Sequence, residues 1–191
     1  MLRMLQAAIV GLIIASAPLG AAPQRNPPRV NPNAATLQEF VRRVDEYVAL
    51  HKKLEATLPA LPKQTNPTEI DKHERALAVL VQEARKTAKQ GELFFPAMQR
   101  LVRKLLRPIF SGKDGLQIKS EILDKEYKGS VKLTVNGRYP DEVPISTVPP
   151  QVLAELPKLP EELEYRFIQA NLILFDPRSH TIADWVERAI P

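Results

Sequence analysis

The chain has 191 residues, 44% of them hydrophobic and 26% charged, a balance that is typical of globular proteins and excludes general disorder. It has no cysteine, which excludes disulfide bonds, thiol catalysis, thiolate metal sites and lipid attachment through a cysteine. The formal net charge of +5 is too small to indicate a partner by itself, and only a cluster of basic residues would do so.

The beginning of the chain, residues 1–22, is typical of a cleavable secretory signal peptide. Arg3 supplies a positive charge, residues 4–17 form a short apolar run, and small residues follow it. This run is shorter than the ~20 apolar residues of a spanning helix, so an uncut membrane anchor is the less favoured alternative. Cleavage is expected after one of two small-residue triplets, 15–17 or 20–22. We therefore expect export to the periplasm or the cell exterior, with no transmembrane segment once the signal is removed.

A flexible leader and then a helical region are expected next. Residues 23–35 are rich in proline and asparagine, which predicts the leader, and the helical region covers residues 36–128. Its first helix is expected to begin at Thr36, in a capping box with Glu39, and to stop at Pro59. Between these limits apolar residues recur every three or four positions, as on one face of a helix.

The second helix carries clear start signals. Asn66 is a capping residue, Pro67 takes the first helical position and Glu69 closes a capping box, while Gly91 is expected to end the helix. Because the connection to the first helix is short, we expect the two to pack as an antiparallel hairpin.

A third helix opens at Phe95-Pro96, is kinked or ended by Pro108, and terminates at Gly112. A weaker fourth helix is expected from Asp114 towards Tyr127, although the same residues are compatible with irregular structure.

The remaining residues, 129–191, predict a proline-rich crossover and an antiparallel β-meander that pack with the helices as one domain. Alternation over 131–135 predicts a strand before an Asn-Gly turn at 136–137, and the prolines at 149–150 predict the start of a short helix. Three further strands are expected over residues 163–167, 172–175 and 181–186, with turns at 169–170 and 176–179. Helices followed by strands indicate an α+β fold.

The C-terminal stretch 156–191 begins with a distinctive run, LPKLPEELEYRF. The residues of interest are Leu159, Pro160, Glu161, Glu162, Leu163, Tyr165, Arg166, Phe167, Asn171 to Asp176, Ile182, Asp184 and Ala189 to Pro191. In these positions the chain resembles a family of exported bacterial proteins of unknown function that carries an LPxLPEELEYRF-type tail. Residues 47–51 and 135–137 also look like family positions, whereas residues 185–188 depart from the pattern. The resemblance implies export and a shared fold, and it implies no catalytic or binding residue.

Two histidines, His51 and His73, lie on the apolar stripes of the first two helices. In an antiparallel hairpin with a rise of ~1.5 Å per residue they would face each other at nearly the same height, with carboxylates such as Glu55 within one turn. Two imidazoles and a carboxylate can hold a zinc ion with an open position. No HExxH-like spacing fixes this geometry, so half-buried histidines at the interface between helices are the simpler interpretation.

The polar face of the third helix carries Arg100, Arg103, Lys104 and Arg107. Such a cluster is a candidate for binding an anionic surface, such as phospholipid head groups or acidic glycans. Aromatic residues that would stack on bases are missing between these positions, so no nucleic-acid partner is expected. The simpler interpretation is the solvated face of a helix whose other side is core.

Signatures of enzymes are weak throughout the sequence. Ser179 and His180 are adjacent, which a turn explains better than a nucleophile–base pair, and the chain has no P-loop, dinucleotide-binding fingerprint or nucleophile elbow. No cofactor is expected. The most favoured function is a non-catalytic exported accessory or interaction protein of the bacterial envelope. The alternative is a small envelope enzyme or metal-binding protein that uses His51 and His73.

Overall fold

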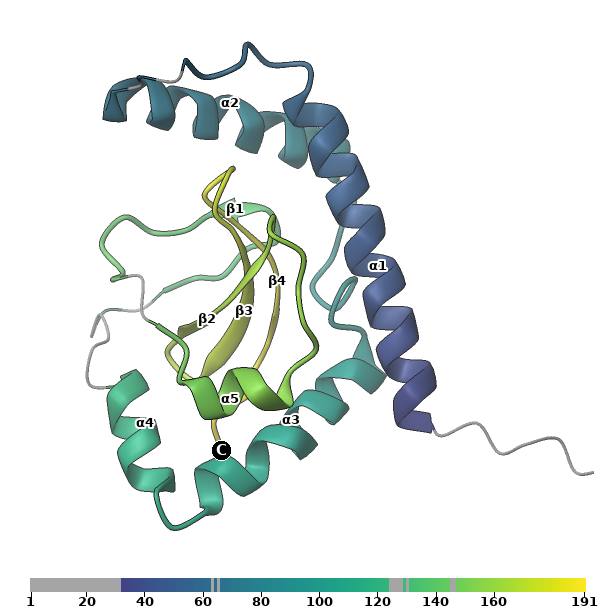
Figure 1. Ribbon diagram of the computed structural model, residues 1–191, viewed down its shortest axis with the longest axis vertical. Coiled ribbons are helices and arrows are strands. Elements are labelled where there is room, and N and C mark those ends of the chain that lie inside the picture. Colours follow the sequence, from purple (N-terminus) through teal and green to yellow (C-terminus); the bar gives the residue numbers. More distant parts are fainter. Residues whose placement is uncertain (1–31, 63, 65, 124–128, 130, 145–146) are drawn as a thin grey trace, which may run out of the picture.

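The chain folds as a series of helices followed by an antiparallel sheet, and this confirms the predicted α+β class (Figure 1). The computed structural model describes residues 32–62, 64, 66–123, 129, 131–144 and 147–191. The helices are α1 (Pro32–Glu55), α2 (Pro67–Ala84), α3 (Pro96–Ser111), α4 (Gly115–Leu123) and α5 (Pro150–Glu155). The strands are β1 (Gly137–Arg138), β2 (Glu164–Ile168), β3 (Asn171–Asp176) and β4 (Thr181–Val186).

The strands form one antiparallel sheet with the order β1-β4-β3-β2. A two-residue loop that contains Gln169 in the left-handed region (φ 54°) joins β2 to β3. The turn between β3 and β4 is held by Asp176, whose Oδ1 accepts hydrogen bonds from the backbone N–H groups of Arg178 and Ser179, both at 3.0 Å. The predicted meander and both of its turns are therefore confirmed. They could be predicted because side-chain alternation and turn residues are local signals.

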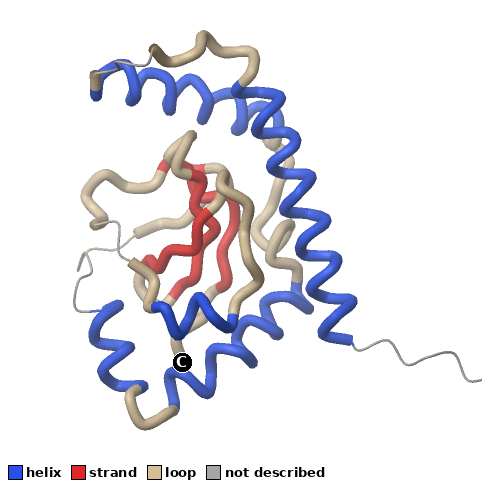
Figure 2. Tube along the Cα trace, viewed as in Figure 1, coloured by secondary structure: helices blue, strands red, loops and turns tan. Residues whose placement is uncertain are grey.

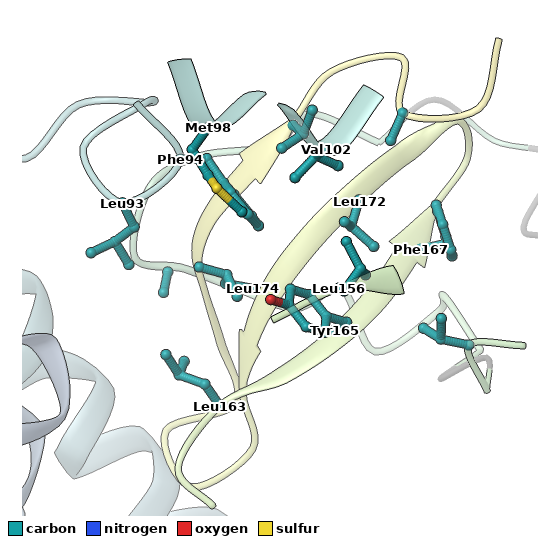
Figure 3. Close-up of a cluster of buried hydrophobic side chains, with 14 of the residues drawn as sticks. Leu93, Phe94, Met98, Val102, Leu156, Leu163, Tyr165, Phe167, Leu172 and Leu174 are labelled. Atoms are coloured by element: carbon teal, nitrogen blue, oxygen red, sulfur yellow. The ribbon is translucent and has the colours of Figure 1, made fainter. Parts of the chain in front are cut away.

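Side chains pack against both faces of the sheet, and β3 and β4 are accordingly buried almost throughout. Figure 2 shows the strands in red with helices arranged around them in this view. On one face, Leu172 and Leu174 pack with Phe94, from the loop before α3, and with Met98, from the first turn of α3, as Figure 3 shows. This cluster also takes in buried residues of α1, α2, α4 and α5. On the other face, a second cluster surrounds Trp185 and includes Tyr139 and Phe175.

The first helix begins earlier than predicted. It starts at Pro32, so residues 32–35 of the expected leader are helical and Thr36 lies inside α1 instead of capping it. A proline is tolerated in the first helical turn, where its missing N–H would have no intrahelical acceptor. The expected signal, residues 1–22, and the rest of the leader lie outside the described residues.

The second helix begins as predicted and then departs from the prediction. The Asn66 cap and its reciprocal box with Glu69 are both formed, whereas the helix ends at Ala84 and not at Gly91. α1 and α2 contact each other, as the predicted helical hairpin requires, but they do not lie side by side along their length. Figure 1 shows α2 set across the end of α1 at a wide angle, above the turn between β3 and β4. Contacts with the β1 region hold it there, since Gln82 donates to the carbonyl of Asn136 and Arg138 pairs with Asp71.

The strand predicted over 131–135 is not formed. Its residues do alternate between half-buried and exposed, and Val131, Leu133 and Val135 pack against the cluster around Trp185. The alternation therefore indicates which side chains face the core, but it does not indicate a paired strand. The residues that pair with β4 are those of the neighbouring β1.

The predicted fourth helix exists as α4, although Leu116, expected on its apolar face, is 83% exposed. Its expected continuation to Tyr127 lies outside the described residues. Within the described part of the chain, no helix is both long and apolar enough to cross a membrane.

Candidate functional site

A buried polar network joins α1 to the end of β3. Tyr47 and His51 lie one turn apart on α1 and both reach Asp176, the last residue of β3. The Tyr47 hydroxyl donates to Asp176 Oδ2 at 2.7 Å, and His51 Nδ1 lies 2.7 Å from the same oxygen. Because the other oxygen of Asp176 holds the following turn, one carboxylate fastens a helix, a strand and a turn together.

The electrostatics of this network favour an ion pair between His51 and Asp176. Burial alone would lower the pKa of His51, but the hydrogen bond and charge of Asp176 outweigh it and raise the pKa above 6.5. Burial alone would raise the pKa of Asp176, but the hydrogen bond and charge of His51, together with Tyr47, lower it below 3.8. Burial, reinforced by the charge of Asp176, raises the pKa of Tyr47 well above 10.0, so Tyr47 stays a neutral donor.

The second nitrogen of His51 faces Glu55. His51 Nε2 is buried without a hydrogen-bond partner among the described residues and lies 3.6 Å from Glu55 Oε2. The other oxygen of Glu55 lies 3.8 Å from His73 Nε2 and accepts a hydrogen bond from Arg178 at 3.0 Å. The structure thus brings both sequence-predicted histidines to the same carboxylate, even though α1 and α2 diverge at a wide angle.

The arrangement does not form a metal centre. Among the residues that the structure describes, no group of three or more histidine, aspartate or glutamate side chains is placed to hold a metal ion. A pocket of about 440 Å³ lies beside Glu55, His73 and Arg178, but His51 does not line it. The side chains of His51 and Asp176 are both fully buried, and the pair joins α1 to the end of β3.

The adjacent Ser179 and His180 lie in the turn between β3 and β4, as predicted. Ser179 Oγ lies 2.7 Å from the Thr181 hydroxyl, and the His180 backbone has a φ of 53°. The His180 ring packs edge-on against Tyr139 and Phe175, and its burial lowers its pKa. The two side chains are each engaged elsewhere and do not form a nucleophile–base pair.

A second buried carboxylate, Asp184, anchors the loop before α3. Its oxygens accept hydrogen bonds from four backbone N–H groups, those of Gly91, Leu93, Phe94 and Trp185, at 2.8–2.9 Å. Burial raises its pKa above 3.8 even though these hydrogen bonds oppose the rise. Sequence reasoning missed this role. The available signal was a charged residue between Ala183 and Trp185 in a strand that has no other charged residue.

The four basic residues of α3 lie in two different environments. Arg103 donates two hydrogen bonds to the carbonyl of Glu187, at 3.0 and 2.9 Å, and thereby holds the segment after β4. Arg100, Lys104 and Arg107 are exposed and form no ion pair with the described residues. One member of the predicted cluster is therefore structural and the other three face solvent.

An apolar recess lies between α5 and β2, the end strand of the sheet. It has a volume of about 540 Å³, and its lining includes Leu153, Leu159, Tyr165, Lys158 and Arg166. Leu153 is 45% exposed, and the Tyr165 hydroxyl donates to the carbonyl of Pro157 at 3.0 Å, which fixes the floor of the recess. We call this recess the α5–β2 groove. No protein-family model, curated protein or solved structure matches the chain.

Proposed function

We propose that the protein is a non-catalytic accessory protein of the bacterial envelope, exported by an N-terminal signal peptide that is then removed, and that it binds an extended segment of another envelope protein. The observation that carries this proposal is the α5–β2 groove, an apolar recess that runs beside an end strand of the sheet. A strand edge beside an apolar groove is the setting in which a peptide adds as a further strand, with backbone hydrogen bonds giving affinity and side-chain pockets giving specificity.

The register of the sheet defines which backbone groups are offered. Ile168 and Asn171 flank the two-residue loop and pair with each other, so Arg166 and Glu164 also face β3 with their backbone groups. The N–H and C=O groups of Tyr165 and Phe167 consequently point away from β3. An added strand would bond to these groups.

The side chain of Arg166 occupies one of these backbone groups, the carbonyl of Tyr165. Its guanidinium donates to the carbonyl of Tyr165 at 3.3 Å and pairs with Glu164, while its Nε has no hydrogen-bond partner among the described residues. Charged side chains on an edge strand discourage indiscriminate pairing between chains. A partner must displace Arg166 from the carbonyl, and a carboxylate on the partner would hold the displaced guanidinium.

The lining of the groove defines the chemistry of the partner. Its walls are leucine, proline and tyrosine, and its charged members are Lys158, Arg166 and Glu164, which leaves one positive charge in excess. The expected occupant is therefore an extended peptide with apolar residues at alternate positions and at least one acidic residue. Export is supported by the signal-like start of the chain and by the resemblance of residues 156–191 to an exported family.

A defined peptide tests the binding function. The probe is a synthetic peptide of alternating valine and threonine with a central glutamate, titrated into isotopically labelled protein and followed by NMR. We expect shift changes in the amides of α5 and β2, with new protection from hydrogen exchange at Tyr165 and Phe167. Leu153→Asp, at the exposed wall of the groove, should weaken binding about tenfold or more, because it places a charge where an apolar side chain docks.

The matched control is Val79→Asp, which changes another exposed apolar residue on α2, away from the groove. It should leave the affinity unchanged. Equal binding by the Leu153→Asp protein, or shift changes that map away from β2, would refute the peptide site. The export part is tested separately, because the protein recovered from the envelope fraction should lack Met1 and the residues up to one of the two expected cleavage points.

A further inference from the structure

Arg85 is almost completely buried, with a side chain only 6% exposed. It follows the last residue of α2, and several contacts fix its position. Its Nη1 donates to Asn136 Oδ1 at 3.0 Å, and Asn136 Nδ2 in turn donates to the Arg85 carbonyl at 3.3 Å. The guanidinium lies over the ring of Tyr47, 4.8 Å from its centroid. The group is therefore held in place before any ligand arrives.

One donor of this guanidinium is unsatisfied. Arg85 Nη2 is buried and has no hydrogen-bond partner among the described residues. Its nearest acid is Glu92, whose Oε2 lies 3.6 Å away, so Glu92 balances the charge without accepting a hydrogen bond. Buried donors are nearly always paired in native proteins, which makes this nitrogen a position for a missing acceptor.

A pocket of about 420 Å³ adjoins this donor between α1 and the connection that follows α2. It is lined by three arginines, Arg42, Arg43 and Arg85, with Glu46 and Glu92 as its acids. Arg43 is oriented by its hydrogen bonds to Glu39 and to the carbonyl of Glu92. Planar guanidinium groups that converge on one pocket are the usual means of recognising carboxylate or phosphate oxygens.

We propose that this pocket binds a small ligand that carries a carboxylate or phosphate group, with Arg85 Nη2 as the central donor. Glu92 occupies the approach to that donor in the structure described here. Its side chain is 49% exposed, so it can turn into solvent and give its place to an oxygen of the ligand. The site shares no residue with the α5–β2 groove, and the two proposals stand or fall separately.

The test uses mature full-length protein at about 0.1 M salt, where interactions between exposed charges beyond ~10 Å are largely screened. The probes are inorganic phosphate and citrate, titrated by calorimetry. Arg85→Gln should lose binding by about tenfold or more, because it removes a charge-assisted hydrogen bond. Glu92→Gln keeps the fold of the exposed loop, removes the competing carboxylate, and should bind either probe more tightly than the unaltered protein.

The matched control is Arg100→Gln, which removes an exposed arginine of α3 and should change nothing. Equal losses for Arg100→Gln and Arg85→Gln would indicate unspecific attraction to a basic protein and would overturn the proposal. So would unchanged or weaker binding by the Glu92→Gln protein, a result that does not depend on how well Arg85→Gln folds.

Vesicles containing phosphatidylglycerol separate two sources of the phosphate group. Sedimentation with vesicles that depends on Arg85 assigns the ligand to a lipid head group. Binding of phosphate or citrate without Arg85-dependent sedimentation assigns it to a free small molecule. Failure of phosphate, citrate and vesicles alike overturns the inference.

Discussion

Replacing Asp176 with alanine tests whether the network between α1 and β3 is the main fastening of the fold. The carboxylate accepts hydrogen bonds from Tyr47 and His51 on one oxygen and from two backbone N–H groups on the other. Its loss leaves two fully enclosed side-chain donors unpaired, and a buried unsatisfied donor costs about 1–3 kcal/mol. Removing one partner of a buried ion pair costs about 3–5 kcal/mol in all. We therefore expect Asp176→Ala to lower the free energy of unfolding by about 4 kcal/mol.

The measurement is urea-induced unfolding followed by circular dichroism at pH 6, with the slope of the transition compared between proteins. A loss of this size is a large part of the 5–15 kcal/mol that is usual for a domain, so the midpoint should fall well below that of the unaltered protein. Asp141→Ala is the matched control, since Asp141 is exposed, and it should change the free energy by about 0.5 kcal/mol or less. A decrease of less than about 1 kcal/mol for Asp176→Ala would refute the anchoring role.

Three further predictions concern other parts of the fold. The raised pKa of His51 means that its stabilisation is present below pH 6.5 and is lost as the pH rises through the folded-state value; His51→Gln should remove this alkaline loss from a series of unfolding measurements. Asn66→Ala should lower the unfolding free energy by about 1 kcal/mol because its side chain caps α2, whereas Thr68→Ala, at an exposed position in the first turn of the same helix, should change it by about 0.5 kcal/mol or less; equal losses on urea unfolding would contradict the capping role. Arg103→Ala should cost about 1 kcal/mol through its two bonds to the backbone carbonyl and Arg100→Ala nearly nothing, as thermal unfolding would show if the basic face is divided between structure and solvent.

The sequence predicted those features that depend on neighbouring residues. The sequence predicted the reciprocal cap of Asn66 and Glu69 and the alternation in β2, because caps and strands depend on residues only a few positions apart. The angle between α1 and α2 was not predicted, because it depends on contacts such as Gln82 with Asn136, which join distant parts of the chain. A short connection predicts that two helices contact each other, but it does not determine the angle between them.

The candidate site shows the same division. His51 stood out as a polar residue on an apolar stripe, but its partner Asp176 is 125 positions further on and was explained by its turn alone. The unpaired nitrogen of Arg85 had no sequence signal, since arginine at a helix end normally faces solvent. Charged residues inside apolar strands, as at Asp184, are the pattern that most directly marks such buried anchors.

The fastening of α1 to the last residue of β3 also bears on the order in which the molecule can assemble. A nascent chain emerges from its N-terminus, so Tyr47 and His51 must wait for Asp176, which arrives 129 and 125 residues later. Contacts between such distant positions are closed late and slowly. Other contacts of the first helix come within reach sooner, because Phe40 stacks on Phe94, so α1 can join the core before Asp176 arrives and fastens it to the end of β3.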